Sequence, residues 1–393
     1  MRRVAVIGGG PAGSFAAERL ARAGLETVVF DEKLAWEKPC GGGLTYKAWN
    51  EYPFLIENDT PRKHITRMNF AAGRVGPVPL HLTEPLLVYS RFDLNNMLLR
   101  RAENAGAQLE KTRVLAMERR DNGWRIRTRG GESEADFCVV ATGGRNPLRN
   151  VGTEWGTGDT ATALGYFVPG DQADIDVQFL PGLDGYIWVF PRCGHLSVGI
   201  CGKSHSAQLM RARLERYMEE RSISTKGAQF YGHVLPSLSH HGWQKNRIAG
   251  DRWLAVGDAA GLVDPLTGEG LYYAMRSGDF ASRAILDDAV APEAKAQAYR
   301  KLVHNDFGAD LEFAALLAGR LYYRRFMFGN VPVRMVQFTR RSPRFCALMQ
   351  DLVAGTQSYV GLKSRLMRGI RGTFGEAVLA FFLNRLIPGE YQV

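Results

Sequence analysis

The chain has 393 residues, a formal net charge of +10 and a hydrophobic fraction of 45%. This length allows two domains or one interrupted domain, and the apolar fraction is ordinary for a globular protein. No apolar run approaches bilayer length, and the short run after Met1 is expected to be a strand rather than a signal peptide. These features predict a cytoplasmic protein, with peripheral contact at the inner membrane face left open.

The chain opens with a strand followed by a glycine-rich turn. The apolar run Val4–Ile7 leads directly into Gly8-Gly9-Gly10-Pro11-Ala12-Gly13. In a βαβ unit of this kind, Gly8 permits the tight turn and Gly10 lets backbone amides approach a pyrophosphate. Gly13 lets the following helix pack against the strand. The pattern therefore predicts a dinucleotide site.

The rest of this unit supports the same prediction. A helix is expected over 11–22, with its positive end toward the phosphates. A second strand over 27–30 leads to Asp31. A carboxylate at the end of the second strand usually holds ribose hydroxyls, and Glu32 is the neighbouring candidate.

The middle of the chain predicts a helix over 91–106 and then a series of strands. Residues 57–87 contain short β-like runs. Further strands are expected over 113–119, 123–129, 137–141, 174–180, 185–191 and 195–201. The strand over 137–141 runs into Thr142-Gly143-Gly144, another turn where backbone can approach a cofactor. A helix is expected over 206–222.

A second glycine turn lies far along the chain. Trp253–Val256 forms a strand that ends in Gly257-Asp258-Ala259-Ala260, and a helix is expected over 270–287. Two such turns suggest that the chain folds back around one dinucleotide, most readily FAD. The sequence has no second GxGxxG for NAD(P)H, so NAD(P)H would bind transiently or a reduced carrier protein would deliver the electrons.

The order of these pieces predicts an α/β fold, α+β overall. A Rossmann-type FAD-binding domain would comprise 1–56, 88–152 and 245–295. An antiparallel-sheet substrate domain, from 57–87 and 153–244, would interrupt it. A helical, basic region would follow over 296–393.

The positive charge is concentrated near the C-terminus. Between Arg320 and Arg371 there are eleven Lys or Arg residues and one acid, Asp351. They are interleaved with bulky apolar residues: Leu321, Tyr322, Tyr323, Phe326, Met327, Phe328, Met335, Phe338 and Phe345. Such a mixture suits an anionic membrane surface, and nucleic acid fits less well. A basic helix packed on the core through its aromatics is the alternative, and the sequence leaves both open.

Four strings resemble the geranylgeranyl reductase group of FAD-dependent oxidoreductases, within the p-hydroxybenzoate hydroxylase-like fold. The resemblance covers roughly residues 1–290. The strings are Gly8–Gly13, Lys38–Leu44 (KPCGGGL), Tyr186–Arg192 (YIWVFPR) and Gly257–Ala260 continuing through Asp264-Pro265 to Gly268-Glu269-Gly270. The second and third are the specific ones, because the other two mark flavoproteins generally.

The resemblance implies that Arg91 touches FAD and that Asp258 holds its ribityl chain. The residues expected to contact FAD are Gly8, Gly10, Pro11, Ala12, Gly13, Asp31, Glu32, Cys40, Gly41, Gly42, Arg91, Val114, Ala141, Thr142, Gly143, Gly257, Asp258, Pro265, Gly268, Gly270 and Leu271. Two departures stand out. Flavin hydroxylases commonly have an Asp-Gly turn where this chain has Thr142-Gly143-Gly144, and the lysine that usually closes the third string is Arg192.

The substrate site is expected on the third string. Tyr186, Trp188 and Phe190 alternate at period two and so share one face of a strand. That face suits an apolar isoprenoid pocket and could stabilise a developing carbocation, with Arg192 near a head group. Ordinary sheet core is the alternative reading. Cys40 is the catalytic candidate, as a proton donor or relay, against the alternative of a small buried residue. Five cysteines without a CxxC pair, and histidines without ligand spacing, predict no metal site.

Three functions remain open at this point. The first is FAD-dependent reduction of C=C bonds in a geranylgeranyl-type lipid. The second is a flavin monooxygenase or halogenase acting on an apolar or aromatic substrate, for which Lys63 is a weak candidate for the halogenase lysine. The third is a non-catalytic flavoprotein that shuttles electrons to a membrane partner.

Overall fold

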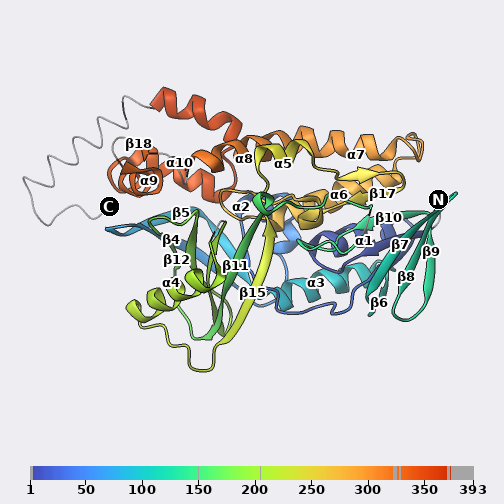
Figure 1. Ribbon diagram of the computed structural model, residues 1–393, viewed down its shortest axis with the longest axis horizontal. Coiled ribbons are helices and arrows are strands. Elements are labelled where there is room, and N and C mark those ends of the chain that lie inside the picture. Colours follow the sequence, from blue (N-terminus) through green and yellow to red (C-terminus); the bar gives the residue numbers. More distant parts are fainter. Residues whose placement is uncertain are drawn as a thin grey trace, which may run out of the picture.

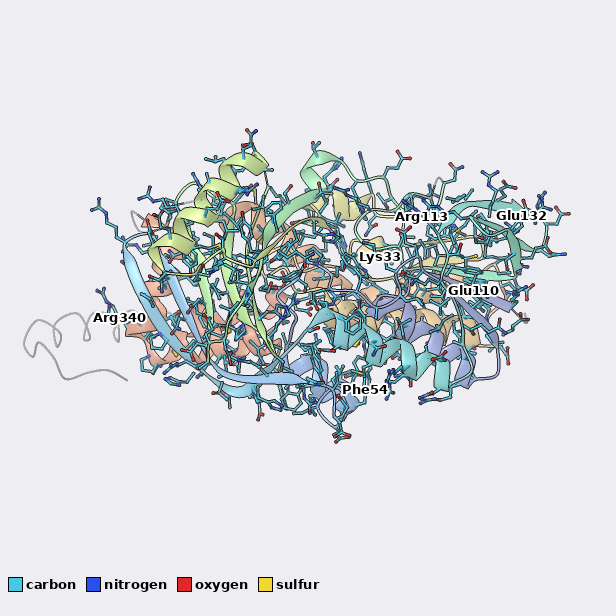
Figure 2. The ribbon with its side chains drawn as sticks, turned by 90° about the horizontal axis from the view of Figure 1, so that it is seen from below. Lys33, Phe54, Glu110, Arg113, Glu132 and Arg340 are labelled. Carbon is cyan, nitrogen blue, oxygen red and sulfur yellow. The ribbon has the colours of Figure 1, made fainter. Side chains whose placement is uncertain are left out.

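The computed structural model describes residues 3–148, 150–203, 205–321, 325–326, 329–369 and 372. The molecule is elongated, with one large sheet at each end and C-terminal helices along one long side (Figure 1). Arg340 on a C-terminal helix and Glu132 on a small sheet mark opposite ends (Figure 2). The predicted α/β architecture is therefore confirmed.

The first sheet has six strands and carries the glycine turns. Its order is β16 (Ala249–Gly250), β17 (Trp253–Ala255), β10 (Phe137–Val140), β1 (Arg3–Ile7), β2 (Glu26–Phe30) and β6 (Gln108–Glu110). All neighbours run parallel except β16 and β17. Residues Val4–Ile7 are buried, as expected for a strand covered on both faces.

Three helices and a small sheet pack around this sheet. The helix α1 (Pro11–Arg22) contacts both α3 (Arg91–Asn104) and α6 (Leu271–Leu286). The three-stranded sheet, which contacts β1 and β10, comprises β7 (Val114–Arg120), β8 (Gly123–Thr128) and β9 (Glu132–Ala135). The helices and the strands β7 and β8 lie close to the bounds that the sequence predicts, whereas β9 was not predicted.

The second sheet has eight strands. Its order is β15 (Gln229–Pro236), β11 (Thr160–Pro169), β14 (His195–Gly202), β13 (Gly185–Pro191), β12 (Ile175–Phe179), β4 (Arg62–Ala72), β5 (Val75–Tyr89) and β3 (Gly43–Leu44). The expected short runs over 57–87 are in fact one long hairpin, β4 and β5. The pairing of β12 with β4 is parallel, so the sheet is mixed where antiparallel pairing was expected. The difference arises because β4 and β12 come from separate segments of the chain, 62–72 and 175–179, and are not joined by a hairpin turn.

The two faces of β13 meet different surroundings. Ile187 and Val189 pack into a core with α4 (Ala207–Glu220), which covers one face of the sheet. On the strands β4, β5 and β12, a separate core includes residues of α9 (Val331–Arg341) and α10 (Pro343–Ala354). This arrangement leaves space between the sheet and the C-terminal helices.

The described C-terminal part is mostly helical. The π-helical turn His304–Gly308 joins α7 (Lys295–Val303) to α8 (Ala309–Leu321), and residues 359–369 are helical. A two-stranded ladder precedes α9, formed by β18 (Arg325–Phe326) and β19 (Gly329–Asn330). The shorter helices are α2 (Tyr46–Glu51), α5 (His240–Gln244) and the 3₁₀ turns Pro53–Leu55, Thr157–Asp159 and Gly257–Ala260. Within the described ranges, no helix is both long and apolar enough to cross a bilayer.

Part of the basic segment packs onto the protein itself. Met335 and Phe345 pack against the core that α9 and α10 share with the large sheet. The Phe338 and Phe345 rings lie 5.8 Å apart. Residues Tyr322, Tyr323, Met327 and Phe328 lie outside the described residues, as do the side chains of Leu321 and Phe326. The described aromatic residues therefore pack on the protein core, as expected for a basic helix that packs through its apolar residues rather than on a membrane.

Candidate active site

A cavity of about 800 Å³ lies between the six-stranded sheet, the eight-stranded sheet and the C-terminal helices. One part of its lining is polar and rich in glycine, and comes from the ends of strands in the six-stranded sheet. The other part is apolar, with Met68, Phe70, Val177, Met335 and Met349 among its residues. The cavity thus joins a cofactor-type half to a hydrophobic half.

The first glycine turn brings backbone close to the cavity. Gly8 has a φ of +109°, and a Cβ added there would lie 2.2 Å from the Ala141 carbonyl oxygen. A Cβ on Gly13 would lie 1.9 Å from the Gly8 carbonyl oxygen. A Cβ on Gly10, by contrast, would meet open space on the cavity side. The crowded backbone at Gly8 and Gly13 and the open space at Gly10 therefore fit a pyrophosphate turn, and the contact with a pyrophosphate stays a prediction.

The loop that contains Cys40 is held from behind by Arg192. The Arg192 side chain has no exposed area and donates hydrogen bonds to the Glu37 carboxylate and to the Cys40 and Gly41 carbonyls. The Ser197 hydroxyl also donates to the Cys40 carbonyl, at 2.8 Å. Arg192 does not line the cavity. This geometry corrects the expected head-group contact, because the guanidinium is enclosed under the loop and its donors are in use.

Glu37 links the same loop to helix α3. Its carboxylate accepts hydrogen bonds from the Ser90 hydroxyl at 2.7 Å and from the Arg91 amide at 2.9 Å, at the N-terminus of the helix. Burial alone would raise the pKa of Glu37, but the Arg192 guanidinium and these donors outweigh it and hold the pKa below its usual range. The ionised Glu37 thus fixes both the Cys40 loop and the start of α3.

Charged side chains gather at the polar end of the cavity. Lys38 Nζ lies 2.9 Å from Asp258 Oδ2. Burial opposes ionisation of Asp258, but Lys38 and the nearby cations outweigh it, and its pKa is lowered. Within the described part of the chain, Arg91 Nε and His233 Nε2 are buried without a hydrogen-bond partner, and both residues line the cavity. Burial and the charge of Lys38 lower the pKa of His233 to about 4, so this imidazole is neutral near pH 7.

These features fit FAD. The open backbone at Gly10 suits a pyrophosphate, and the unpartnered Arg91 and His233 nitrogens supply hydrogen-bonding positions on the cavity wall. Asp258 and Lys38 would meet the ribityl and phosphate portion. The fit rests on a glycine cradle and orphaned polar atoms that face the same space.

The hydrophobic half is built on β13. Tyr186, Trp188 and Phe190 all line the cavity, as the period-two pattern predicts. The Trp188 ring packs directly on Gly199, where a Cβ would lie 2.2 Å from Cζ2. A Cβ on Gly43 would lie 2.9 Å from the Phe190 ring, so the Cys40 loop packs against this strand. The aromatic face therefore forms the wall between the flavin-type loop and the apolar space.

A loop before α6 carries two further carboxyl groups into the lining. Asp264 is buried; its Oδ2 accepts from the Tyr359 hydroxyl at 2.6 Å, and burial raises its pKa. Glu269 Oε1 accepts from the Tyr272 amide at 2.9 Å. Burial, with the charge of Asp264, raises the pKa of Glu269 to about 7. Both groups thus favour the protonated form more than exposed carboxyls do.

The structure brings most of the predicted site residues into one lining. The residues found there are Gly10, Pro11, Ala12, Cys40, Gly41, Gly42, Arg91, Gly143, Tyr186, Trp188, Phe190, Asp258, Gly268, Gly270 and Leu271. Gly8, Gly13, Ala141 and Gly257 lie behind this wall, where backbone is closely packed. Pro265 lines a smaller neighbouring cavity.

The remaining predicted cofactor residues lie outside the cavity. The Asp31 carboxylate accepts from the Gly9 amide at 2.7 Å, beside the turn. Glu32 is exposed and lies 3.8 Å from Arg113, near the start of β7 at Val114. Thr142 Oγ1 lies 3.1 Å from Asn146 Oδ1. Their contact with FAD stays a prediction.

Several lining residues were not predicted. Lys38 and Glu269 lie inside two of the four strings, so the sequence could place them near the site but did not indicate what their side chains contact. Tyr231, His233 and Leu235 alternate along β15 and line the cavity together. That period-two spacing was the signal that could have identified them.

Comparison with known proteins agrees with this geometry. The family model for pyridine nucleotide-disulphide oxidoreductases matches residues 2–162. The chloroplastic geranylgeranyl diphosphate reductase of Oryza sativa subsp. japonica is 33% identical over 316 residues, which cover 72% of this chain and 66% of the rice protein. The chain therefore spans just under two thirds of that relative's length.

The chain belongs to the geranylgeranyl reductase family of FAD-dependent oxidoreductases. Menaquinone reductase of Mycobacterium tuberculosis is 28% identical over 362 residues, covering 84% of this chain and 87% of that protein. A geranylgeranyl bacteriochlorophyll reductase-like protein of Thermoplasma acidophilum shares the fold, with a TM-score of 0.74 and 23% identity over 94% of this chain and 99% of that one.

Proposed function

We propose that this enzyme reduces isolated C=C bonds in the prenyl chain of a geranylgeranyl-type lipid. One observation carries the proposal: a single cavity joins the glycine, Arg91 and Asp258 cradle to a long apolar lining. When bound and reduced, FAD supplies a hydride for the alkene. The apolar half would place the alkene beside the cradle.

The chain's own residues would position the prenyl chain and exclude water. The aromatic rings of Trp188 and Tyr186 line the cavity and would stabilise positive charge developing on an alkene carbon next to a ring face. Met335 and Met349 come from the C-terminal helices and would enclose the chain on the other side. Cys40, on the loop packed against Phe190, lines the same cavity; its role in proton transfer, as the donor or as a relay from a stronger acid, stays a prediction.

The alternatives receive less support from the geometry. Lys63, the candidate for a halogenase lysine, does not line the cavity, and its Nζ pairs with Asp171, so its position gives that interpretation no support. An electron-shuttling flavoprotein would not need an apolar cavity of this size. A monooxygenase with an apolar substrate remains the second candidate, because the cavity would also accept one.

The test is an anaerobic turnover. The holoenzyme is reduced with dithionite and mixed with a prenyl lipid, and flavin absorbance and product mass are followed together. Geranylgeranyl diphosphate and menaquinone are the two probes, since relatives are named for them. Flavin oxidation with mass gains of two hydrogens per step is expected. Oxygen incorporation only after air enters would establish the monooxygenase instead.

The electron donor is proposed to be NAD(P)H or a reduced carrier protein. The family model that matches the first part of the chain describes pyridine-nucleotide enzymes, which supports the first choice. Anaerobic mixing of oxidised enzyme with NADPH, NADH or a reduced ferredoxin identifies the donor by the rate of flavin bleaching. Bleaching by reduced ferredoxin but by neither NADPH nor NADH would exclude a nicotinamide as the donor.

Peripheral membrane contact is proposed for the helical stretch 359–369. Val360 and Met367 are 57% and 60% exposed there, and Lys363 and Arg368 are exposed beside them. Apolar and basic residues together suit an anionic bilayer, where prenyl lipids reside. Co-sedimentation with vesicles of phosphatidylglycerol and phosphatidylcholine is expected and should weaken with salt. Absence of binding at low salt would exclude this contact.

A further inference from the structure

Reduction of an alkene needs a proton as well as a hydride, and the cavity holds carboxyl groups that could provide it. Among the described residues, the carboxyl groups in the lining are those of Asp258, Asp264 and Glu269. Among side chains with unperturbed pKa values, carboxylic acids have the lowest pKa and are therefore the strongest proton donors. The three carboxyl groups differ in their protonation state and in whether hydrogen bonds already occupy their oxygens.

Asp258 and Asp264 are poorly suited to donate a proton. The ion pair with Lys38, 2.9 Å away, keeps Asp258 ionised. Asp264 has both oxygens engaged, Oδ2 by the Tyr359 hydroxyl at 2.6 Å and Oδ1 by the Leu266 amide at 2.8 Å. Asp258 therefore lacks the proton, and the Asp264 carboxyl group is turned toward its own loop and the helix 359–369.

Glu269 lies at the junction of the two halves of the cavity. Next to it, a Cβ on Gly270 would lie 3.5 Å from Asp258 Oδ1, in the polar half. On the other side of the same loop, the Tyr186 hydroxyl donates to the Thr267 carbonyl, which ties the loop to the aromatic wall. The hydrogen bond from the Tyr272 amide orients the carboxyl group of Glu269. Its position thus borders both the cofactor cradle and the alkene space.

We propose that Glu269 is the general acid that protonates the prenyl alkene, an inference that rests on the prenyl-reductase function proposed above. The π bond breaks as one carbon takes the proton from the Glu269 carboxyl group. The other carbon takes the hydride that reduced FAD supplies. The substrate gains two hydrogens, FAD is left oxidised, and Glu269 is left as a carboxylate that regains its proton from solvent before the next turnover.

The surroundings of Glu269 suit a proton that is held and then released. Burial, followed by the charge of Asp264, raises its pKa to about 7, so a large fraction is protonated near neutrality. Lys47 from α2 is the nearby cation and stabilises the carboxylate after transfer. The other titratable groups that interact with this cluster are Asp310 on α8, Tyr272 and Tyr273 on α6, and Tyr359 on the last described helix. A pKa near the working pH is the efficient range for acid catalysis.

The decisive variant is Glu269→Gln, which keeps the shape and an acceptor for the Tyr272 amide but has no acidic proton. Single-turnover oxidation of reduced flavin by the prenyl lipid should slow at least about 100-fold. Flavin content, dithionite reduction and reoxidation by oxygen should be unchanged. Glu293→Gln, at a surface glutamate that is 73% exposed, is the matched control and should keep the wild-type rate.

The pH dependence gives a second readout. The wild-type single-turnover rate should fall as pH rises above about 7, because the acid is then deprotonated. An infrared titration of the holoenzyme without substrate should show a protonated carboxyl band that is lost over the same range and missing from Glu269→Gln. If that variant does not fold, the wild-type rate profile and infrared titration decide the matter.

The outcomes separate the two proposals. If the wild type reduces no prenyl lipid, the proposed function fails and the proton-donor role falls with it. If the wild type is active and Glu269→Gln has a rate within about threefold of it, the general-acid role alone is overturned, because a real acid contributes 10²-fold or more. A Glu269 carboxyl group that is already ionised at pH 5 would also overturn the role.

Discussion

Replacing Arg192 by methionine tests how the Cys40 loop is held. Arg192 is fully buried and donates hydrogen bonds to the Glu37 carboxylate and to the Cys40 and Gly41 carbonyls. Methionine fills comparable space but supplies no donor, so Glu37 would lose its counter-charge, the Gly41 carbonyl would lose the Arg192 donor, and the Cys40 carbonyl would keep only the Ser197 hydroxyl. The variant therefore removes one side of a buried ion pair without removing the other.

The expected loss of folding free energy follows from that geometry. Truncating one partner of a buried pair typically costs about 3–5 kcal/mol. Glu37 is 26% exposed and keeps the Ser90 hydroxyl and the Arg91 amide, so the lower end, about 3 kcal/mol, is expected. If about 1.4 kcal/mol of this loss falls on the ordering of the loop, FAD binding weakens about tenfold.

Urea unfolding of the apoprotein and fluorescence titration with FAD measure these two effects. Arg192→Lys, which keeps the charge but loses the planar set of donors, should fall between wild type and Arg192→Met. Arg216→Met is the control, because the Arg216–Glu220 pair is exposed and should contribute less than about 1 kcal/mol. A loss below about 1 kcal/mol for Arg192→Met would refute the reasoning, since that is the value of a surface pair.

The Arg192 effect should also depend on pH. The pKa of Glu37 is lowered in the folded state, so the pair's contribution is present above the unfolded value near 4.5 and is lost as pH falls through the lower folded value. The difference in stability between wild type and Arg192→Met should therefore narrow in acid. A difference that stays constant down to the acid transition would mean that the charge of Glu37 is not involved.

Three further predictions use other parts of the structure. Gly13→Ala should purify without flavin, judged by visible absorbance, because its Cβ would lie 1.9 Å from the Gly8 carbonyl oxygen; retained flavin would contradict the role of this glycine. Gly199→Ala should displace the Trp188 ring, whose Cζ2 lies 2.2 Å from the added Cβ, and so abolish prenyl turnover while flavin content is retained; unchanged turnover would show that Trp188 is not needed in place. In the wild type, the free energy of unfolding should fall as pH rises from about 4.5 to about 7, because the folded state keeps the Glu269 proton that the unfolded state releases. Glu269→Gln should lack this decrease. Chemical unfolding of both proteins at several pH values measures the difference, and parallel stability curves for the two proteins would argue against the raised pKa.

Much of the site was accessible to sequence reasoning because it depends on local backbone geometry. The glycines at 8, 10 and 13 follow a strand and precede a helix, and that order alone assigns each a role. The alternation of Tyr186, Trp188 and Phe190 places them on one face, since successive side chains of a strand point to opposite sides. The structure shows the close backbone packing at Gly8 and Gly13 and places the three aromatic residues together in the cavity lining, while their contacts with FAD and substrate stay predictions.

The predictions that failed involve surroundings that no local pattern specifies. Arg192 carries a charge at the end of the aromatic string, which indicated a head-group contact, yet it is enclosed beneath the Cys40 loop. The runs over 57–87 looked like short strands, yet β4 and β5 form one long hairpin that pairs with β12. Glu37 and Arg192, like β4 and β12, come from distant parts of the chain, so no local pattern could pair them.

The sequence by itself determined the βαβ unit, the second glycine turn and the aromatic face, and with them the flavin-dependent class. Only the tertiary structure decided which charges meet. Asp258 and Lys38 are separated by 220 positions along the chain, and Arg192 and Glu37 by 155. The pKa of Glu269 likewise depends on burial and on neighbours from α2, α6 and the loop before α6. Periodicity and turn chemistry act over a few residues, whereas burial and electrostatics depend on how distant segments pack.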